Sequence, residues 1–120
     1  MDTKTLDEIN KLIDIQNQSI ELGRSLSNLE KNPDFKKIIN DIYIDEGTKI
    51  LWDNIRLYEE ADMLDKGSVR AENIGKFKVE IQARLILKRF FDIVRIDADN
   101  APDALQELTQ EKENILKENN

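Results

Sequence analysis

Residues 85–96 read LILKRFFDIVRI, and eight of these twelve positions are apolar. A helix that is apolar nearly all round lies in the interior of a helical protein. The β-branched residues would also suit a strand, but the length of the run and the periodic charges beside it favour a helix. Ile74, Phe77 and Ile81 precede it at spacings of three and four residues, so they extend the same helix. The run predicts the central helix of an all-α protein.

The first thirty residues carry two adjacent apolar seams at helical spacing. Thr5 and Glu8 form a capping box, in which each side chain can accept from an otherwise unsatisfied backbone N–H, so a helix is expected to begin here. Gly23 lies within the apolar stripe, where it predicts either the close approach of a partner helix or a simple kink. One seam consists of Leu6, Ile9, Ile13 and Ile20, and the other of Leu12, Ile15, Leu22, Leu26 and Leu29.

Three segments in the rest of the chain are expected to end one helix and begin the next. Asn32-Pro33-Asp34 begins a second helix, because Asn caps helix starts and Pro suits the first helical position. Gly47 is a candidate interruption of that helix, and Lys66-Gly67-Ser68 is expected to end it and cap the third. The polar stretch 97–100 predicts the end of the third helix, after which Pro102 opens a last one.

The expected fold is therefore all-α, with three long helices in an antiparallel bundle or hairpin arrangement plus a C-terminal helix. Residues 1–100 are predicted to form a helical bundle domain, and residues 101–120 a C-terminal amphipathic helix or arm. The thin seam of that last helix contains Leu105, Leu108, Ile115 and Leu116.

The composition argues against most enzyme mechanisms. The 120 residues include no histidine and no cysteine, which removes the usual near-neutral acid/base group, the thiolate nucleophile, the zinc finger and the disulfide. The net charge of −7 argues against general binding to nucleic acid or to an acidic membrane, and no apolar run is long enough to span one. We expect a soluble intracellular protein that is not an enzyme.

Two acidic stretches contain carboxylates that could bind a metal ion, but neither matches the ligand pattern of a known metal site. Glu59, Glu60, Asp62 and Asp65 cluster near the end of the second helix, but their spacing is that of a solvated helix face, and no histidine completes a di-iron site. Residues 97–100 begin like a calcium loop that the following residues do not continue. No metal and no cofactor is predicted.

The charge is distributed unevenly along the chain. Residues 67–100 contain seven basic and five acidic residues, whereas every other segment is acidic. Antiparallel packing of a basic helix against acidic neighbours explains this pattern most simply. The alternative is a phosphate-facing surface built from Arg70, Lys76, Lys78, Arg84, Lys88, Arg89 and Arg95.

One stretch resembles a known group of proteins. Residues 26–39 read LSNLEKNPDFKKII and are followed by Tyr43 and Glu46. This stretch is similar to a Leu-x-x-Leu-x-x-Asn-Pro-Asp-Phe-Lys segment in small helical proteins of tailed bacteriophages. The resemblance covers about 20 residues by its motif, and the size and helical layout of the rest are alike; the chain departs from the pattern after Gly47. It implies a virus-encoded protein from the genes that build the head and its connector, and it supplies no catalytic residues.

Two functions remain open from the sequence. The first is a non-enzymatic structural or assembly component of a phage, which packs against copies of itself or against another virion protein. The second is an acidic, phage-encoded regulator that binds and inhibits a host enzyme. The protein is expected in the host cytoplasm or the virion.

Trp52 is open to two interpretations, because a single Trp is more often partly buried core but is also enriched where proteins bind one another. Helix packing is expected to involve Ile9, Ile13, Ile20, Leu26, Phe35, Ile42 and residues 85–94. The residues predicted to contact a protein partner are Trp52, Tyr58, Leu105, Leu108 and Ile115.

Overall fold

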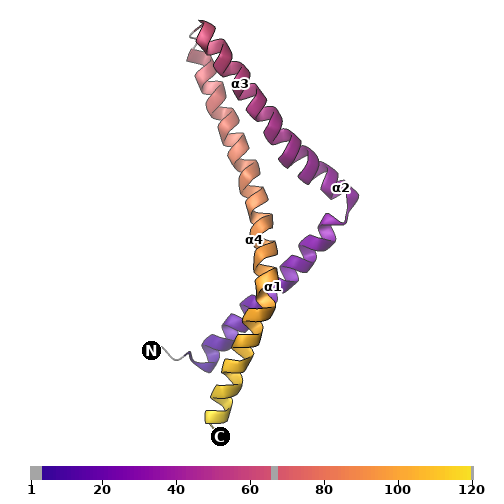
Figure 1. The fold of residues 1–120 in the computed structure, drawn as a ribbon, viewed down its shortest axis with the longest axis vertical. Helices are drawn as coiled ribbons and strands as arrows, with labels where there is room; N and C mark the ends of the chain where they lie inside the picture. Colours follow the sequence, from indigo (N-terminus) through magenta and orange to yellow (C-terminus); the bar gives the residue numbers. More distant parts are fainter. Residues whose placement is uncertain (1–3, 66–67, 120) are drawn as a thin grey trace. The chain divides into compact units, whose positions relative to one another are not determined.

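The computed structural model describes residues 4–65 and 68–119, and for residues 62, 64, 65 and 68–70 it describes the backbone alone. Its elements follow in the order α1 (Leu6–Glu30), α2 (Pro33–Phe35), η1 (Lys36–Glu46), α3 (Gly47–Asp65) and α4 (Ser68–Glu118) (Figure 1). No strand occurs in the described part of the chain, which confirms the all-α class. The bundle or hairpin arrangement of three helices stays a prediction. The helix end predicted at Lys66-Gly67 lies outside the described residues.

Two of the predicted helix starts, at Thr5 and at Asn32, are confirmed by their capping hydrogen bonds. The N–H of Glu8 donates to Thr5 Oγ1 at 3.2 Å, and the N–H of Thr5 donates to Glu8 Oε2 at 3.4 Å, which is the reciprocal pattern of a capping box. At the second start, Asn32 Oδ1 accepts from the N–H groups of Asp34 at 2.9 Å and Phe35 at 3.3 Å. Pro33 occupies the first helical position, where its missing N–H costs no hydrogen bond.

The segment η1 is a π-helix, which the sequence pattern does not predict. Its 11 residues follow a wider winding than an α-helix, in which each N–H bonds to the carbonyl five residues earlier. The wider period moves Tyr43 and Ile44 to the inner side and leaves Ile38 and Ile42 about half exposed. The winding becomes α-helical at Gly47, so the interruption expected there is a change of helix type within a continuous helix.

The expected break before Pro102 is wrong. The helix α4 runs without interruption for 51 residues and contains both the polar stretch 97–100 and Pro102. A proline inside a helix removes one hydrogen bond and costs about 3 kcal/mol. Here the uninterrupted helix keeps Val94, Ala101 and Leu108, all of them buried and seven residues apart, on one face. Burial along that face offsets the local cost of the proline.

Two compact units make up the chain. Unit 1 consists of Met1–Leu29 and Phe91–Asn120, and unit 2 consists of Glu30–Phe90. The division into domains at residue 100 stays a prediction.

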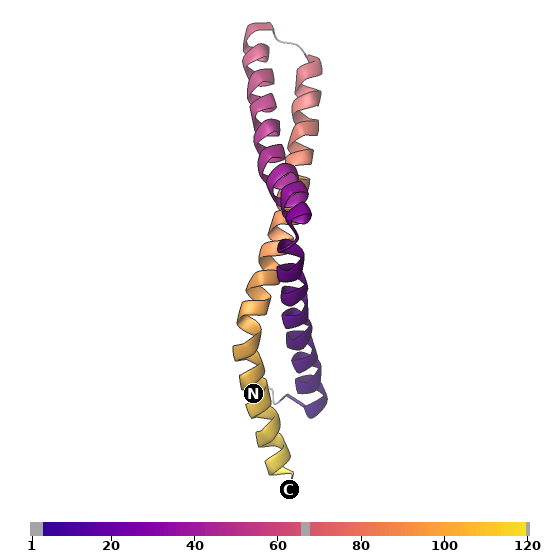
Figure 2. The ribbon, with the colours of Figure 1, turned by 90° about the vertical axis from the view of Figure 1, so that its right-hand side faces the viewer.

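Within unit 1, α1 and the second part of α4 run in opposite directions side by side (Figure 2). Lys4 Nζ lies 3.7 Å from Glu111 Oε2, and further along α1 Gly23 lies against Ala98. The seam of α1 that contains Ile9 faces α4, since Ile9 is fully buried and Leu6, Ile13 and Ile20 are half-buried.

Gly23 marks a close crossing of the two helices, as one of its two interpretations predicted. A Cβ atom placed on Gly23 would collide with the Cβ of Ala98, so the two backbones approach more closely than any larger pair of residues would permit. The chain stays helical through Gly23, within the α1 range Leu6–Glu30.

Within unit 2, α3 lies antiparallel to the first part of α4 (Figures 1 and 2). Leu51 and Ile55 of α3 form a buried cluster with Ile81 of α4, and Ile74 and Phe77 pack against it. The ring of Tyr58 lies 5.5 Å from that of Phe77, at an interplanar angle of 44°. Such tilted aromatic pairs contribute about 1 kcal/mol beyond the area they bury.

Arg84 of α4 connects η1 to this helix pair. Its Nε donates to the carbonyl of Tyr43 at 3.0 Å, its Nη1 donates to the carbonyl of Glu80 at 3.0 Å, and its guanidinium carbon lies 4.3 Å from the centre of the Tyr43 ring. A Cβ on Gly47 would lie 2.9 Å from Arg84 Nε, so a glycine is needed for this approach. Arg84 thus contacts η1 at two places, the backbone carbonyl of Tyr43 and the aromatic ring of Tyr43.

Candidate protein-interaction surfaces

Apolar side chains on the surface are the main chemical feature of the described residues. Among those residues, nine apolar side chains are buried, whereas sixteen large ones are exposed. Isolated exposed apolar residues are normal, but apolar residues aligned along a helix mark a surface that another protein can cover. Exposed apolar residues that align along one side of a helix are therefore the candidates for such a surface.

The first aligned set is the α1 stripe, defined as Ile15, Leu22 and Leu29. These residues are 51%, 56% and 45% exposed, and the spacing of seven residues places them along one side of the helix. They belong to the second seam recognised in the sequence, of which Leu26 is buried and Leu12 half-buried. One seam of α1 thus packs inside unit 1, while most of the other faces solvent.

A groove of about 290 Å³ runs beside the α1 stripe within unit 1. Its lining residues are Ile15, Gln16 and Ser19 from α1, with Asp97, Asn100 and Ala104 from α4. The hydroxyl of Ser19 donates to the carbonyl of Ile15 at 3.2 Å, so this polar group is already satisfied by the helix itself. Its lining is mixed: Ile15 and Ala104 are apolar, Asp97 is a carboxylate, and the other three residues are polar and uncharged.

The second aligned set is the α4 stripe, defined as Val79, Ala83 and Ile86 in unit 2. All three are exposed, Val79 by 64% and Ile86 by 68%. Their spacing of four and three residues places them on one side of α4, and Ile81, which packs against α3, lies on the other. A shallow depression beside Val79 is lined by Glu72, Gly75, Lys76 and Glu80.

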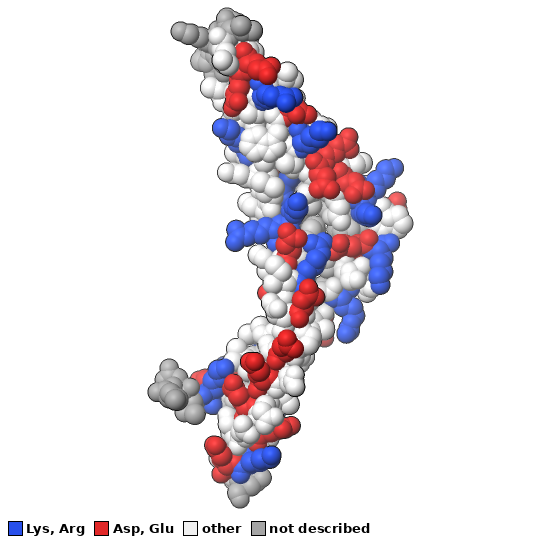
Figure 3. Space-filling model, in the orientation of Figure 1, with Lys and Arg blue, Asp and Glu red and all other residues white. Residues whose placement is uncertain are grey.

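The two units differ in charge. Unit 1 contains 13 acidic and 6 basic residues and carries the entire net charge of −7, whereas unit 2 contains 12 of each sign. Figure 3 shows acidic side chains predominating over the C-terminal part of α4, with both signs mixed over α3. Within unit 2, the α4 residues 68–90 hold six basic and two acidic residues, so this helix segment is basic.

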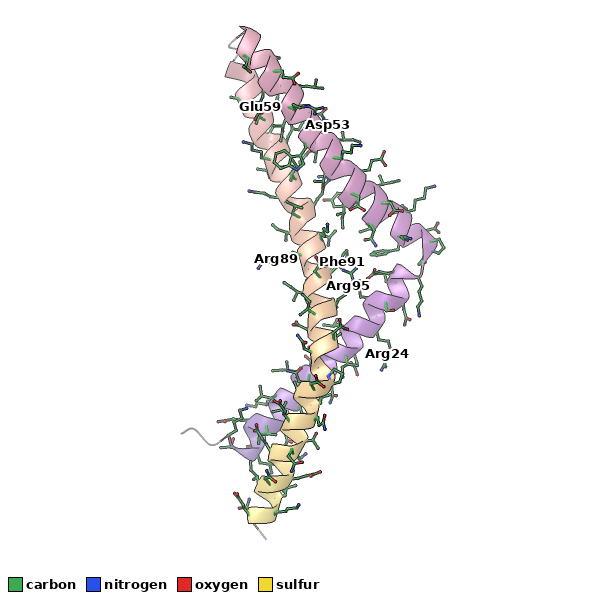
Figure 4. All side chains as sticks on the ribbon, viewed as in Figure 1. Arg24, Asp53, Glu59, Arg89, Phe91 and Arg95 are labelled. Carbon is green, nitrogen blue, oxygen red and sulfur yellow. The ribbon has the colours of Figure 1, made fainter. Side chains whose placement is uncertain are left out.

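The basic residues of α4 do not form one phosphate-facing surface. Arg84 turns toward Tyr43, Lys76 Nζ lies 3.7 Å from Glu72, and Arg95 donates to Asp92 at 2.8 Å. Arg89 extends from α4 at an exposed position (Figure 4). Lys78 and Lys88 are also exposed. The side chain of Arg70 lies outside the described residues.

The five residues predicted to contact a partner occupy different environments. Trp52 is 51% exposed on α3, which favours the partner anchor over the core interpretation. Tyr58 is half-buried against Phe77. Leu105 and Ile115 are half-buried and Leu108 is 7% exposed, so these three residues pack mainly inside unit 1.

Sequence reasoning missed the α4 stripe, because the run 85–96 was interpreted as buried core. In the structure Leu85, Ile86, Phe90 and Ile93 are exposed, while Val94 is buried and Leu87 and Phe91 are half-buried. The signal that could have found the stripe is the spacing of seven residues from Val79 to Ile86, which lies outside the face used by Phe77 and Ile81.

No group of three acidic residues in the described part of the chain could hold a metal ion. Glu59 and Glu60 are exposed on α3, and the side chains of Asp62 and Asp65 lie outside the described residues. None of the described helices is both long and apolar enough to cross a membrane. Comparisons with protein-family models, curated proteins and solved structures give no match.

Proposed function

We propose that this chain is a non-enzymatic structural or assembly component that acts through helix-mediated protein–protein contacts. The observation that supports the proposal is the number of large apolar residues left exposed, together with their alignment in the α1 and α4 stripes. Covering such stripes removes apolar surface from water, at about 25 cal/mol per Å². A helix with its own apolar side is the partner that fits a stripe of this spacing.

The setting proposed for this function is a tailed-bacteriophage particle, with the protein in the virion or in the host cytoplasm before assembly. This part of the proposal rests on the similarity of residues 26–39 to small helical phage proteins. In the structure that segment contains the cap at Asn32 and the start of η1. Its motif therefore has a structural reason as a helix start, and it supplies no reactive group.

The test is whether the chain is a stoichiometric part of particles, with the α1 stripe as the variable. Particles assembled with wild-type chain should contain it at a fixed copy number, and Leu22→Glu should reduce its incorporation several-fold. Leu116→Glu is the matched control, because Leu116 is 45% exposed in unit 1 outside the stripe and the groove. Complete absence of the wild-type chain from particles would contradict the assembly role.

The second candidate is an acidic regulator of a host enzyme, and the concentration of negative charge in unit 1 favours it. Such a protein would use unit 1 to occupy a basic groove. Recovery of the chain with one host enzyme from infected cells, in a complex that dissociates at high salt, would support this candidate over the first.

A further inference from the structure

The α1 stripe and the α4 stripe have complementary properties. Both are single helix sides with apolar residues at coiled-coil spacing, so each can interlock with a helix of the other kind. From Ile15 to Leu29 the α1 stripe covers about 21 Å at 1.5 Å per residue, and from Val79 to Ile86 the α4 stripe covers about 10 Å. The α4 stripe can therefore lie along part of the α1 stripe in a helix-to-helix contact.

The net charges around the two stripes are of opposite sign. The α1 stripe belongs to unit 1, where exposed Asp14 and Glu21 and the groove residue Asp97 outnumber Lys11 beside it. The α4 stripe belongs to segment 68–90, which holds six basic and two acidic residues; Lys76, Lys78 and Arg89 lie near it, together with both of those acidic residues, Glu72 and Glu80. Pairing unit 1 with a second unit 1 would bring two bodies of net charge −7 together, whereas pairing the α1 stripe with the α4 stripe joins an acidic and a basic surface.

We propose that the α4 stripe of one copy of this chain docks on the α1 stripe and the adjoining groove of a second copy. The inference rests on the proposed function and names the partner as the protein itself. Because the two stripes are different surfaces, the contact is head-to-tail, and each copy keeps one stripe available for a further copy. Repetition of the contact gives a ring or a filament, either of which suits an assembly component.

The groove beside Ile15 explains why a helix can seat there. It lies between α1 and α4 of unit 1, and Ala104, a small residue, forms part of its wall. The hydroxyl of Ser19 is already bonded to the carbonyl of Ile15. A docked helix would cover Ile15 and Ala104, and its own polar side chains can bond to the remaining polar lining residues in place of water.

The test uses one defect in each stripe and a mixture of the two variants. Leu22→Glu damages the α1 stripe and Ile86→Glu the α4 stripe; each places a carboxylate in the proposed contact. Sedimentation velocity should show concentration-dependent association for the wild-type chain and at least about tenfold weaker association for either variant. Mixing the two variants should restore a 1:1 complex of two chains, since each variant keeps the stripe that the other lacks.

Matched controls separate the stripes from general exposure. Leu116→Glu in unit 1 and Leu57→Glu in unit 2 alter residues that are 45% and 58% exposed outside the stripes, and both should associate like the wild type. Circular dichroism of all variants should show unchanged helix content. Association should also weaken as salt is raised, because charges of opposite sign border the two stripes.

Three results would overturn the inference. The first is a variant in one stripe that associates as strongly by itself as the wild type does, which would indicate a contact between two copies of the other stripe. The second is association that strengthens with salt. The third is a wild-type chain that stays monomeric and binds a synthetic basic amphipathic helix instead. That last result would leave the proposed function to be decided by incorporation into particles.

Discussion

Units 1 and 2 both contain antiparallel helices, but different contacts hold them together. In unit 1 the backbones of α1 and α4 approach at Gly23 and Ala98, and Ala101 is fully buried nearby. In unit 2 larger side chains fill the space, with Tyr58 against Phe77 and Arg84 across Tyr43. Small residues allow close backbones but tolerate no added volume, whereas the larger contacts depend on the geometry of individual side chains.

The stability of the two units should therefore respond to different substitutions. Added side-chain volume should destabilise unit 1 most, and loss of hydrogen bonds or ring contacts should destabilise unit 2 most.

Replacing Pro102 by alanine should sharpen the contrast by strengthening unit 1. The substitution restores an N–H that can donate to the carbonyl of Ala98, and it should raise the free energy of unfolding by up to about 3 kcal/mol. Urea unfolding monitored by circular dichroism measures the change. Pro33→Ala is the control, since that proline occupies a first helical position and its replacement should change stability little. Equal effects of both variants would contradict the account of α4.

Enlarging Gly23 should break the close contact of unit 1. Gly23→Leu forces α1 away from Ala98 and should lower the free energy of unfolding by about 2 kcal/mol, after allowance for the better helix propensity of leucine. Gly75→Leu is matched to it, because no atom lies within 4 Å of a Cβ at Gly75, and it should stabilise the protein by up to about 1 kcal/mol. Hydrogen exchange should place the loss at Gly23 in unit 1. Exchange that quickens equally in unit 2 would argue against a local contact.

Removing the guanidinium of Arg84 tests the polar contact of unit 2. Arg84→Met keeps most of the aliphatic stem but loses the hydrogen bond to Tyr43 and the contact with its ring, with an expected cost of about 1–2 kcal/mol. Arg56→Met removes an exposed pair with Asp53, whose atoms are 3.5 Å apart, and should cost well under about 1 kcal/mol. Thermal unfolding of both variants gives the comparison. A cost at Arg84 no larger than at Arg56 would show that the contact with Tyr43 is dispensable.

The two helix caps allow the smallest comparison. Asn32→Ala should cost about 1 kcal/mol, because Asn32 Oδ1 accepts from two N–H groups. Thr5→Ala should cost less, about 0.5 kcal/mol, since it removes one capping bond, from the N–H of Glu8 to Thr5 Oγ1 at 3.2 Å, and leaves the bond from the backbone N–H of Thr5 to Glu8 in place. Denaturant midpoints with unchanged slopes would measure both. A larger loss at Thr5 would reverse this ranking of the caps.

The parts of the fold that depend on neighbouring residues could be predicted from the sequence. Thr5 and Glu8 predict the start of α1, and Asn32 and Pro33 predict the start of α2. Both starts are visible in the sequence because a capping side chain and the N–H group that it accepts from are two or three residues apart. The prediction of a new helix at Pro102 failed because its local sequence is that of a helix start. The burial of Val94, Ala101 and Leu108 on one face, which favours a continuous α4, is not visible in neighbouring residues.

The candidate surfaces were harder to predict than the helices. Two seams on α1 were visible in the sequence, but which seam faces α4 depends on Gly23 meeting Ala98, a contact across 75 residues of chain. The π-helical winding of η1 could not be predicted either, because spacings of three and four residues do not distinguish a π-helix from an α-helix over this segment. Its signal in the structure is the exposure of Ile38 and Ile42.

The wide winding of η1 also bears on how this chain can change in length. Deleting one residue from an α-helix rotates everything beyond it by about 100° relative to what precedes it, which would turn the seams of α1 or α4 away from their partners. A π-helix already holds more residues in each turn than an α-helix does. Lys36–Glu46 is therefore the stretch of this protein where a one-residue deletion has room to be absorbed, by a return to ordinary winding.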